Sequence, residues 1–516
     1  MDILNSLGLY NYQVDALRQT ETERKGIVVL PTSTGKTMVQ SAIIAKDILM
    51  NSGQFRMYVI NAPRIILTYQ LLKEVYKFLT KVGIDARYHF THSGSAIDER
   101  DLEDIRMEAN RDGFDIPFAQ IDSTTSSNRL LEAMEKSREQ ELPLIIFSTY
   151  NSAHRIEDAR REMRHPISIV MNDEAHYLVQ ERFYEVLDIL KSSRMYFFTA
   201  TMRYTPSEEG RGMNNEDTYG KVLYKLTPRE AIDRGKMVRP RLHLITTAGV
   251  FTSEDYDRSL NLVICNSFKE HKKHFELKHP NTKPKMLVGT RGSDDMKNFL
   301  LSRECAELRN DGVDIFAISS NEEIGNNVNG VRVKRQEFLS ILREYGRDRD
   351  KMLLVLHYDI LTEGIDVPGF TSCLLLRTLT KSKFLQTFGR CARLDPEDRK
   401  KLDSGEIRPT DTDLMNKPYA FVILPNITQT NKDDSEFMKG LVREMREYGF
   451  NSKEDIIGDF EPVGISEEEP LEGLNEVNRR NTSTGRIIQE VLSEIEDESI
   501  AKLSPLEYLQ QHLELN

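Results

Sequence analysis

The chain has 516 residues, of which 39% are hydrophobic and 29% are charged, and its formal net charge is −12. This length predicts about two to four globular domains, and the composition allows each of them a large core. An acidic total by itself argues against a nucleic-acid binder, but a local basic groove can coexist with acidic outer faces, so the total carries little weight. No apolar run reaches the roughly 20 residues of a membrane helix. The N-terminal segment MDILNSLGLY also lacks the pattern of a signal peptide. We therefore expect no membrane partner and a cytoplasmic location in a bacterium or a phage-infected cell.

In the first half of the chain, short segments rich in Val and Ile alternate with helical patterns. The expected strands are residues 26–30, 57–62, 143–149, 167–173 and 195–200. Helix-like segments such as residues 64–79 follow most of them, and unbroken apolar strands between helices predict a parallel sheet covered on both faces. A polar stretch at residues 91–117 is expected to be a surface insertion.

The second half repeats this pattern after a basic connector. The connector, residues 219–245, carries seven Lys or Arg positions, and two interpretations stay open: a solvated linker helix, or a basic rim beside a nucleic-acid path. The expected strands of the second half are residues 285–290, 314–319, 352–357, 372–377 and 419–425. A polar loop is expected at residues 321–331. The pattern predicts a second α/β domain in series with the first.

The last segment, residues 449–516, is acidic and partly helical in pattern. Apolar side chains at positions 487, 488, 491, 492 and 495 share one helical face, and SPLE at residues 504–507 is typical of a helix start. We expect an accessory tail that is available to a protein partner.

A predicted phosphate loop, LPTSTGKT, occupies residues 30–37 between an expected strand and a helical pattern. A phosphate cradle needs backbone N–H groups at a helix N-terminus, a lysine for the β- and γ-phosphates, and a hydroxyl for Mg²⁺. Gly35, Lys36 and Thr37 supply these groups. Leu30 and Ser33 stand where glycine or alanine is commoner, which we interpret as variation.

Two further segments carry chemistry that complements this loop. MNDEAHYL places Asp173 and Glu174 at the end of an expected strand, where one carboxylate can hold Mg²⁺ and the next can orient or deprotonate an attacking water. QTFGRCAR places Arg390 and Arg393 three residues apart, on one helical face, where guanidinium groups can stabilise charge on a γ-phosphate. Either segment alone is weak, but together with the phosphate loop they predict ATP hydrolysis.

The ordered set of motifs resembles the superfamily 2 DEAD/DEAH-box helicases. It consists of YNYQ (10–13), PTSTGKT (31–37), APRIILTYQ (62–70), STYNS (148–152), DEAH (173–176), TAT (199–201), TEGID (362–366) and QTFGRCAR (386–393). The set spans roughly residues 9–425. Two motif sequences resemble the ResIII/UvrB-like branch more than the DEAD-box RNA helicases. Gln386 stands where DEAD-box RNA helicases commonly have histidine, and TAT replaces their SAT. That branch includes restriction-enzyme motor subunits and phage recombination helicases.

The resemblance implies an α/β fold of two tandem RecA-like parallel-sheet domains, residues 1–235 and 236–448, followed by the tail 449–516. It also implies the nucleotide site. The residues expected to bind ATP are Gln13, which would read the adenine, and Thr32, Ser33, Thr34, Gly35, Lys36, Thr37, Asp173, Gly364 and Asp366. Thr37 and Asp173 would hold Mg²⁺, and Lys36, Glu174, Arg390 and Arg393 would be catalytic.

The remaining motif positions are expected to join hydrolysis to movement. Thr199, Thr201 and Gln386 match coupling positions, and Arg64, Thr149, Arg291 and Thr362 match contacts to a nucleic-acid backbone. We predict an ATP-dependent DNA helicase or translocase whose motor unit is a monomer. An RNA helicase, and a nucleic-acid-binding ATP switch within a repair or defence complex, stay open. Intact Glu174, Arg390 and Arg393 argue against the switch.

Overall fold

The computed structural model describes two compact units, Met1–Thr227 and Pro228–Asn516. The described residues are 7–92, 121–124, 126–190, 192–205, 210–246, 256–279, 281–319, 321–358, 369–376, 381–426, 445 and 456–457. The division falls before helix α11 (Pro228–Asp233), earlier than the boundary predicted after residue 235. The reason is local, because the segment after α11 bonds within the second unit: Val238 N donates to Ala392 O at 3.0 Å. No described helix is long and apolar enough to cross a membrane.

The first unit is built on an eight-stranded sheet in the order β4-β3-β5-β2-β6-β7-β1-β8, with every pair parallel. The strands are β1 (Lys25–Val29), β2 (Met57–Ala62), β3 (Arg87–Thr91), β4 (Ile121–Thr124), β5 (Leu144–Thr149), β6 (Ile167–Asn172), β7 (Ser192–Thr199) and β8 (Lys221–Lys225). All residues of β2, β5 and β6 are buried, as unbroken apolar strands predict for a sheet covered on both faces.

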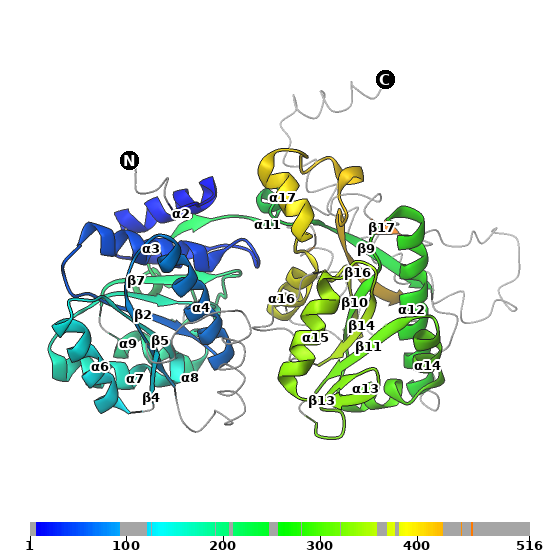
Figure 1. The fold of residues 1–516 in the computed structure, drawn as a ribbon, viewed down its shortest axis with the longest axis horizontal. Coiled ribbons are helices and arrows are strands. Elements are labelled where there is room, and N and C mark those ends of the chain that lie inside the picture. Colours follow the sequence, from blue (N-terminus) through cyan, green and yellow to red (C-terminus); the bar gives the residue numbers. More distant parts are fainter. Residues whose placement is uncertain are drawn as a thin grey trace, which may run out of the picture. The chain divides into compact units, whose positions relative to one another are not determined.

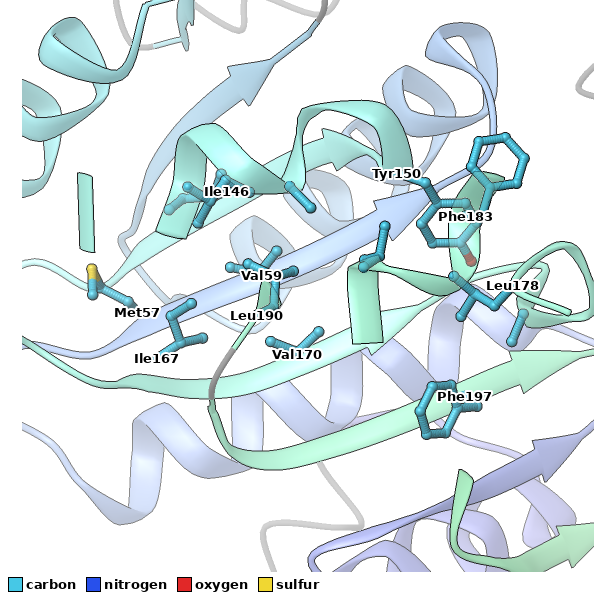
Figure 2. Close-up of a cluster of buried hydrophobic side chains, with 14 of the residues drawn as sticks. Met57, Val59, Ile146, Tyr150, Ile167, Val170, Leu178, Phe183, Leu190 and Phe197 are labelled. Carbon is cyan, nitrogen blue, oxygen red and sulfur yellow. The ribbon is translucent and has the colours of Figure 1, made fainter. Parts of the chain in front are cut away.

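Helices cover this sheet, and its core lies between strands and helices. The helices are α2 (Asn11–Thr22), α3 (Lys36–Met50), α4 (Ile65–Lys81), α6 (Ser127–Glu139), α7 (Ala153–Met163), α8 (Glu181–Tyr184), α9 (Val186–Ile189) and α10 (Glu216–Tyr219). Figure 2 shows one side of the core, where Val59, Val170 and Phe197 of the strands pack in one cluster with Leu178 and Phe183. This packing fixes the strand ends that carry the predicted site.

The second unit has a nine-stranded sheet in the order β13-β12-β11-β14-β10-β15-β16-β9-β17. The strands are β9 (Arg239–Thr246), β10 (Lys285–Gly289), β11 (Val313–Ile318), β12 (Asn326–Val328), β13 (Val331–Val333), β14 (Met352–His357), β15 (Ser372–Leu375), β16 (Tyr419–Asn426) and β17 (Ile456–Ile457). In Figure 1, α12 (Tyr256–Lys278) and α14 (Arg303–Asn310) lie on one side of this sheet, and α15 (Arg335–Arg347) and α16 (Lys381–Cys391) on the other. The remaining helices are α13 (Ser293–Leu300) and α17 (Pro396–Ser404).

One edge of the second sheet differs from the prediction. The expected polar loop at residues 321–331 contains a hairpin, because β12 pairs antiparallel with both β11 and β13. Asn329 and Gly330 form its turn with φ values of 52° and 90°, and an Asn-Gly pair with positive φ at both positions matches the twist of paired strands. The sheet is therefore mixed, and the prediction of a purely parallel second domain is wrong at this edge.

The connector and the tail also differ from the prediction. Residues 219–245 form no linker helix: they contain β8, the short helix α11 and most of β9, which pairs with β16 along eight residues. Ile456 and Ile457, assigned to the tail, pair with Leu242 and His243 of β9 as part of the second sheet. The remainder of 449–516, with its predicted helices, lies outside the described residues.

Candidate functional site

The predicted phosphate loop links β1 to α3. Leu30, which replaces the usual first glycine, is fully buried, and its N–H bonds Thr199 O at 3.0 Å, so it extends the sheet rather than the cradle. Ser33 and Gly35 have φ values of 71° and 83° and turn the chain into the start of α3 at Lys36. Gly35 suits this turn because a residue with a side chain rarely adopts such a φ, and a Cβ there would also displace the Gln13 amide, whose Nε2 would lie 2.5 Å away. The loop has the form of an anion cradle at a helix N-terminus.

Helix α2 holds the loop from one side. The Tyr12 hydroxyl donates to Thr34 O at 2.6 Å, and Gln13 Nε2 donates to the same oxygen at 3.2 Å. Gln13 Oε1 accepts from Tyr10 N at 3.0 Å, and the rings of Tyr10 and Tyr12 are stacked. The Gln13 amide thus lies against the phosphate loop, and its contact with adenine stays a prediction. Tyr12 was not predicted as a site residue.

Asp173, directly after β6, is held at three atoms by buried partners. Its N–H bonds Asn61 O at 2.8 Å, its carbonyl accepts from the Tyr150 hydroxyl at 2.5 Å, and Oδ1 accepts from Gln40 Nε2 at 2.8 Å. Burial raises the pKa of Tyr150 well above its ordinary value, so its hydroxyl stays a donor. Neither Gln40 nor Tyr150 was predicted from the sequence. Together these contacts fix the orientation of the carboxylate predicted to hold Mg²⁺.

Glu174 lies between the phosphate loop and the TAT segment. Its Oε1 is 3.0 Å from Lys36 Nζ, and its Oε2 is 3.3 Å from His176 Nδ1. The same His176 nitrogen is 3.2 Å from Thr199 Oγ1, which donates to Thr201 O at 2.7 Å. The structure therefore brings the predicted catalytic pair together and connects it to the two predicted coupling threonines of this unit.

The pKa values of the Asp173 and Glu174 carboxyl groups are shifted in opposite directions. Burial and the neighbouring charge of Glu174 raise the pKa of Asp173 to about 6. Lys36 and the hydrogen bond from Gln40 lower this pKa, but their effect is smaller. Burial alone would raise the pKa of Glu174, but the charge of Lys36 and the hydrogen bond with His176 outweigh it, and this pKa lies well below its ordinary range. Glu174 is thus held as a carboxylate.

The donor set suits Mg-ATP. No group of three or more His, Cys, Asp or Glu side chains among the described residues is arranged to hold a metal. Mg²⁺ does not need such a cage, since it is usually held by one or two carboxylates together with water and substrate phosphates. Thr37 in the first turn of α3 and Asp173 supply a hydroxyl and a carboxylate of this kind. The phosphate loop would take the triphosphate.

The residues predicted to contact nucleic acid differ in exposure and in hydrogen-bond partners. Arg64 is exposed at the start of α4, and Thr149 ends β5, buried, with its hydroxyl 3.0 Å from that of Ser152. Ala62 of β2 pairs with Thr149 in register, so both segments leave the same sheet edge. In the second unit, Arg291 forms a bidentate pair with Asp295, at 3.1 and 2.9 Å. Thr362 lies outside the described residues.

The predicted arginine pair belongs to the second unit. Arg390 is 8% exposed in α16, and Arg393 follows that helix. Burial and the nearby Arg399 lower the pKa of Arg393 to about 10. Lys417, itself 2% exposed, donates to Arg393 O at 2.5 Å and holds the end of the segment. Gln386 lies in α16, whereas Gly364 and Asp366 lie outside the described residues.

Comparisons with known proteins agree with the motif resemblance. The profile of the ResIII family, described as the Type III restriction enzyme res subunit, matches residues 6–204. No curated protein sequence matches the chain significantly.

Solved structures with the same fold include two restriction-modification enzymes. The ATP-dependent Type ISP enzyme LlaBIII bound to DNA is similar with a TM-score of 0.64 and 18% identity, over 94% of this chain and 33% of that one. A nuclease-deletion mutant of the Type ISP enzyme LlaGI in complex with a DNA substrate mimic gives 0.55 and 16%, over 87% and 30%. The chain spans about a third of the length of these enzymes. The first unit therefore carries a ResIII domain over residues 6–204, and the chain shares the fold of these enzymes, in agreement with its motif resemblance to the superfamily 2 helicases.

Proposed function

We propose that the chain hydrolyses Mg-ATP and uses the cycle to translocate along nucleic acid, DNA in preference to RNA. The observation that carries this proposal is the meeting of three distant motifs: Lys36 lies 3.0 Å from Glu174, and Glu174 reaches the TAT segment through His176. The ResIII match supports DNA as the nucleic acid along which the chain moves. So do the two restriction-modification enzymes that share the fold, since one was solved with DNA and the other with a DNA substrate mimic.

In this mechanism Lys36 changes partner. Without nucleotide its ammonium neutralises Glu174, and with ATP in the loop it turns to the β- and γ-phosphates. Glu174 is then released to accept a hydrogen bond from the attacking water and to take its proton. Bound Mg²⁺ supplies Lewis-acid stabilisation of the phosphate oxygens. Asp173, fixed by Gln40, and Thr37 would hold that ion.

The second unit contributes to hydrolysis, and the TAT segment joins hydrolysis to movement. Arg390 and Arg393 of the second unit supply positive charge to the transition state, which is a large part of catalysis in phosphoryl transfer. The chain from Glu174 through His176 to Thr199 and Thr201 carries the change at the γ-phosphate into the backbone after β7. Nucleic acid held by Arg64, Thr149, Arg291 and Thr362 is displaced by that change.

The test is an ATPase panel with no nucleic acid, single-stranded, double-stranded and forked DNA, and single-stranded RNA. We expect strong stimulation by DNA and little by RNA. Glu174→Gln should lower turnover by about 10²–10⁴-fold, the usual contribution of a general base, while ATP binding persists. Lys36→Ala should also abolish turnover, and Lys46→Ala is its matched control, because Lys46 lies on the same helix and pairs with Glu21 instead.

Three outcomes would change the proposal. Substantial turnover in Lys36→Ala or Glu174→Gln would reject the assignment of the site. Stimulation by RNA alone would make the chain an RNA helicase. Activity indifferent to every nucleic acid would indicate a switch controlled by a protein partner, with the tail 449–516 as its first candidate contact.

A further inference from the structure

Tyr150 is a buried tyrosine that the mechanism above does not use. It lies in the turn Tyr150–Ser152 that follows β5, within the motif STYNS, and it is 1% exposed. Its ring packs against Phe183 at 5.5 Å between centroids, and Figure 2 shows the two rings side by side at one end of the core. A phenylalanine would satisfy this packing equally well, so the hydroxyl needs another explanation.

The hydroxyl holds the peptide bond that precedes Glu174. It donates to Asp173 O at 2.5 Å, and that carbonyl belongs to the same peptide plane as the Glu174 nitrogen. Glu174 has φ 49° and ψ 47°, a left-handed conformation that is uncommon for a residue with a side chain. Such a conformation persists only where the surroundings hold it in place. The Tyr150 hydroxyl is one of the groups that do so.

The other end of the same turn carries a predicted nucleic-acid contact. Thr149 is the residue before Tyr150, and its hydroxyl shares a 3.0 Å hydrogen bond with Ser152. Ser148 Oγ donates to Thr149 O at 3.0 Å. These bonds tie the turn together, so a shift of Thr149 moves Tyr150 with it.

We propose that Tyr150 is a positioning residue that relays nucleic-acid binding at the STYNS turn to the orientation of Glu174. The relay is short: backbone contact at Thr149, movement of the turn, and a change in the hydrogen bond from Tyr150 to Asp173 O. It sets where the Glu174 carboxylate points, and hence how well it aligns the attacking water. This inference rests on the proposed function, because it requires ATP hydrolysis stimulated by nucleic acid.

The test uses Tyr150→Phe in the full chain, with Tyr196→Phe as the matched control. Tyr196 is also fully buried, and its hydroxyl donates to Thr20 O and, at 2.9 Å, to Glu23 O, at the end of α2 remote from Glu174. Three quantities are measured for each variant: the ratio of stimulated to basal ATP turnover, the dissociation constant for fluorescent single-stranded DNA, and the midpoint of thermal unfolding.

We expect Tyr150→Phe to reduce the stimulation ratio by about fivefold or more, the factor that corresponds to a hydrogen bond of roughly 1 kcal/mol. DNA affinity should stay within about twofold, because no nucleic-acid contact is removed. Tyr196→Phe should keep the wild-type ratio of stimulated to basal turnover, even if its thermal midpoint falls as much as that of Tyr150→Phe. A merely structural role would lower both midpoints and leave both ratios unchanged, and that result would overturn the relay.

Failure of the relay can be told apart from failure of the proposed function. If wild-type turnover is not stimulated by any nucleic acid, the proposed function fails. If wild-type turnover is stimulated and Tyr150→Phe retains the full ratio, the relay alone is wrong. If Tyr150→Phe loses DNA affinity in proportion to its stimulation, Tyr150 supports the binding turn and does not act on Glu174, and the relay is again rejected.

Discussion

Replacing Gln40 by methionine should weaken magnesium use without unfolding the first unit. Gln40 is fully buried on α3, and its Nε2 donates a hydrogen bond to Asp173 Oδ1 at 2.8 Å. Among the described residues, its Oε1 atom has no hydrogen-bond partner. Methionine has the same length and nearly the same volume, so Gln40→Met removes the donor, relieves the unsatisfied oxygen, and preserves packing.

The magnitude follows from the charge on the acceptor. A hydrogen bond to an ionised group contributes about 1.5–3 kcal/mol, twice or more the contribution of a neutral bond. If the bond matters mainly when Asp173 must face the metal, its loss appears in the transition state. Turnover per unit of bound nucleotide should then fall by about tenfold to 150-fold. The free energy of unfolding should change far less, since the lost bond and the removed orphan oxygen offset each other.

The assay is steady-state ATP hydrolysis over a series of Mg²⁺ concentrations, with thermal unfolding measured on the same samples. Gln40→Met should need more Mg²⁺ and reach a lower plateau. Gln40→Glu, which keeps the length but turns an acceptor toward Asp173, should be worse still. Gln19→Met, at an exposed position on α2, is the control for the substitution itself. Wild-type Mg²⁺ dependence and plateau in Gln40→Met, or a Gln40→Glu variant more active than Gln40→Met, would refute the reasoning.

Three other predictions concern the second unit and the base pocket. Arg390→Ala should leave ATP binding nearly intact and slow hydrolysis by about 10³-fold or more, as for other arginine fingers, and unchanged single-turnover rates would show that it is not one. Gln13→Ala should erode the preference for ATP over GTP in competition binding, and an unaltered preference would mean that the amide only braces the phosphate loop. Burial and the neighbouring His274 lower the pKa of His243 from 6.5 to about 4. The unfolded chain therefore binds this proton first, and the free energy of unfolding should fall by about 2–3 kcal/mol as the pH drops from about 7.5 to about 4.5. Urea unfolding followed by circular dichroism should show a smaller fall in His243→Phe, and equal falls would contradict the assignment.

Sequence reasoning located the strands whose sequence is a continuous apolar run and missed strands that charged or polar residues interrupt, such as β3 and β8. β2 has the predicted limits, residues 57–62, because five of its six residues are hydrophobic, which fits a strand buried on both faces. β8 lies at the sheet edge as KVLYK and is largely exposed, so its charged ends gave no strand signal. The hairpin was different, since Asn329-Gly330 between valines is a strong turn signal that the polar composition of residues 321–331 obscured.

The residues of the candidate site also differ in how well the sequence predicts them. Motif residues such as Lys36 and Glu174 were predicted because their chemistry is local to a short segment. Gln40 had a usable signal, since it lies four residues after Lys36 and so shares its helical face. Tyr150 had none, because its partner is 23 residues away in the chain and is reached only through the strand order.

That strand order gives the relay its physical basis. In the first sheet β2 lies between β5 and β6, and the registers pair Ala62 with Thr149 and Asn61 with Asn172. The ends of β5 and β6 are thus two strand spacings apart, roughly 10 Å. A tyrosine side chain crosses most of that distance past β2, and its hydroxyl supplies the donor at the far end. A phenylalanine reaches as far without a donor, and a serine has a donor without the reach. Coupling between the turn that carries Thr149 and the peptide before Glu174 therefore needs no extended pathway, and it depends on one hydroxyl group.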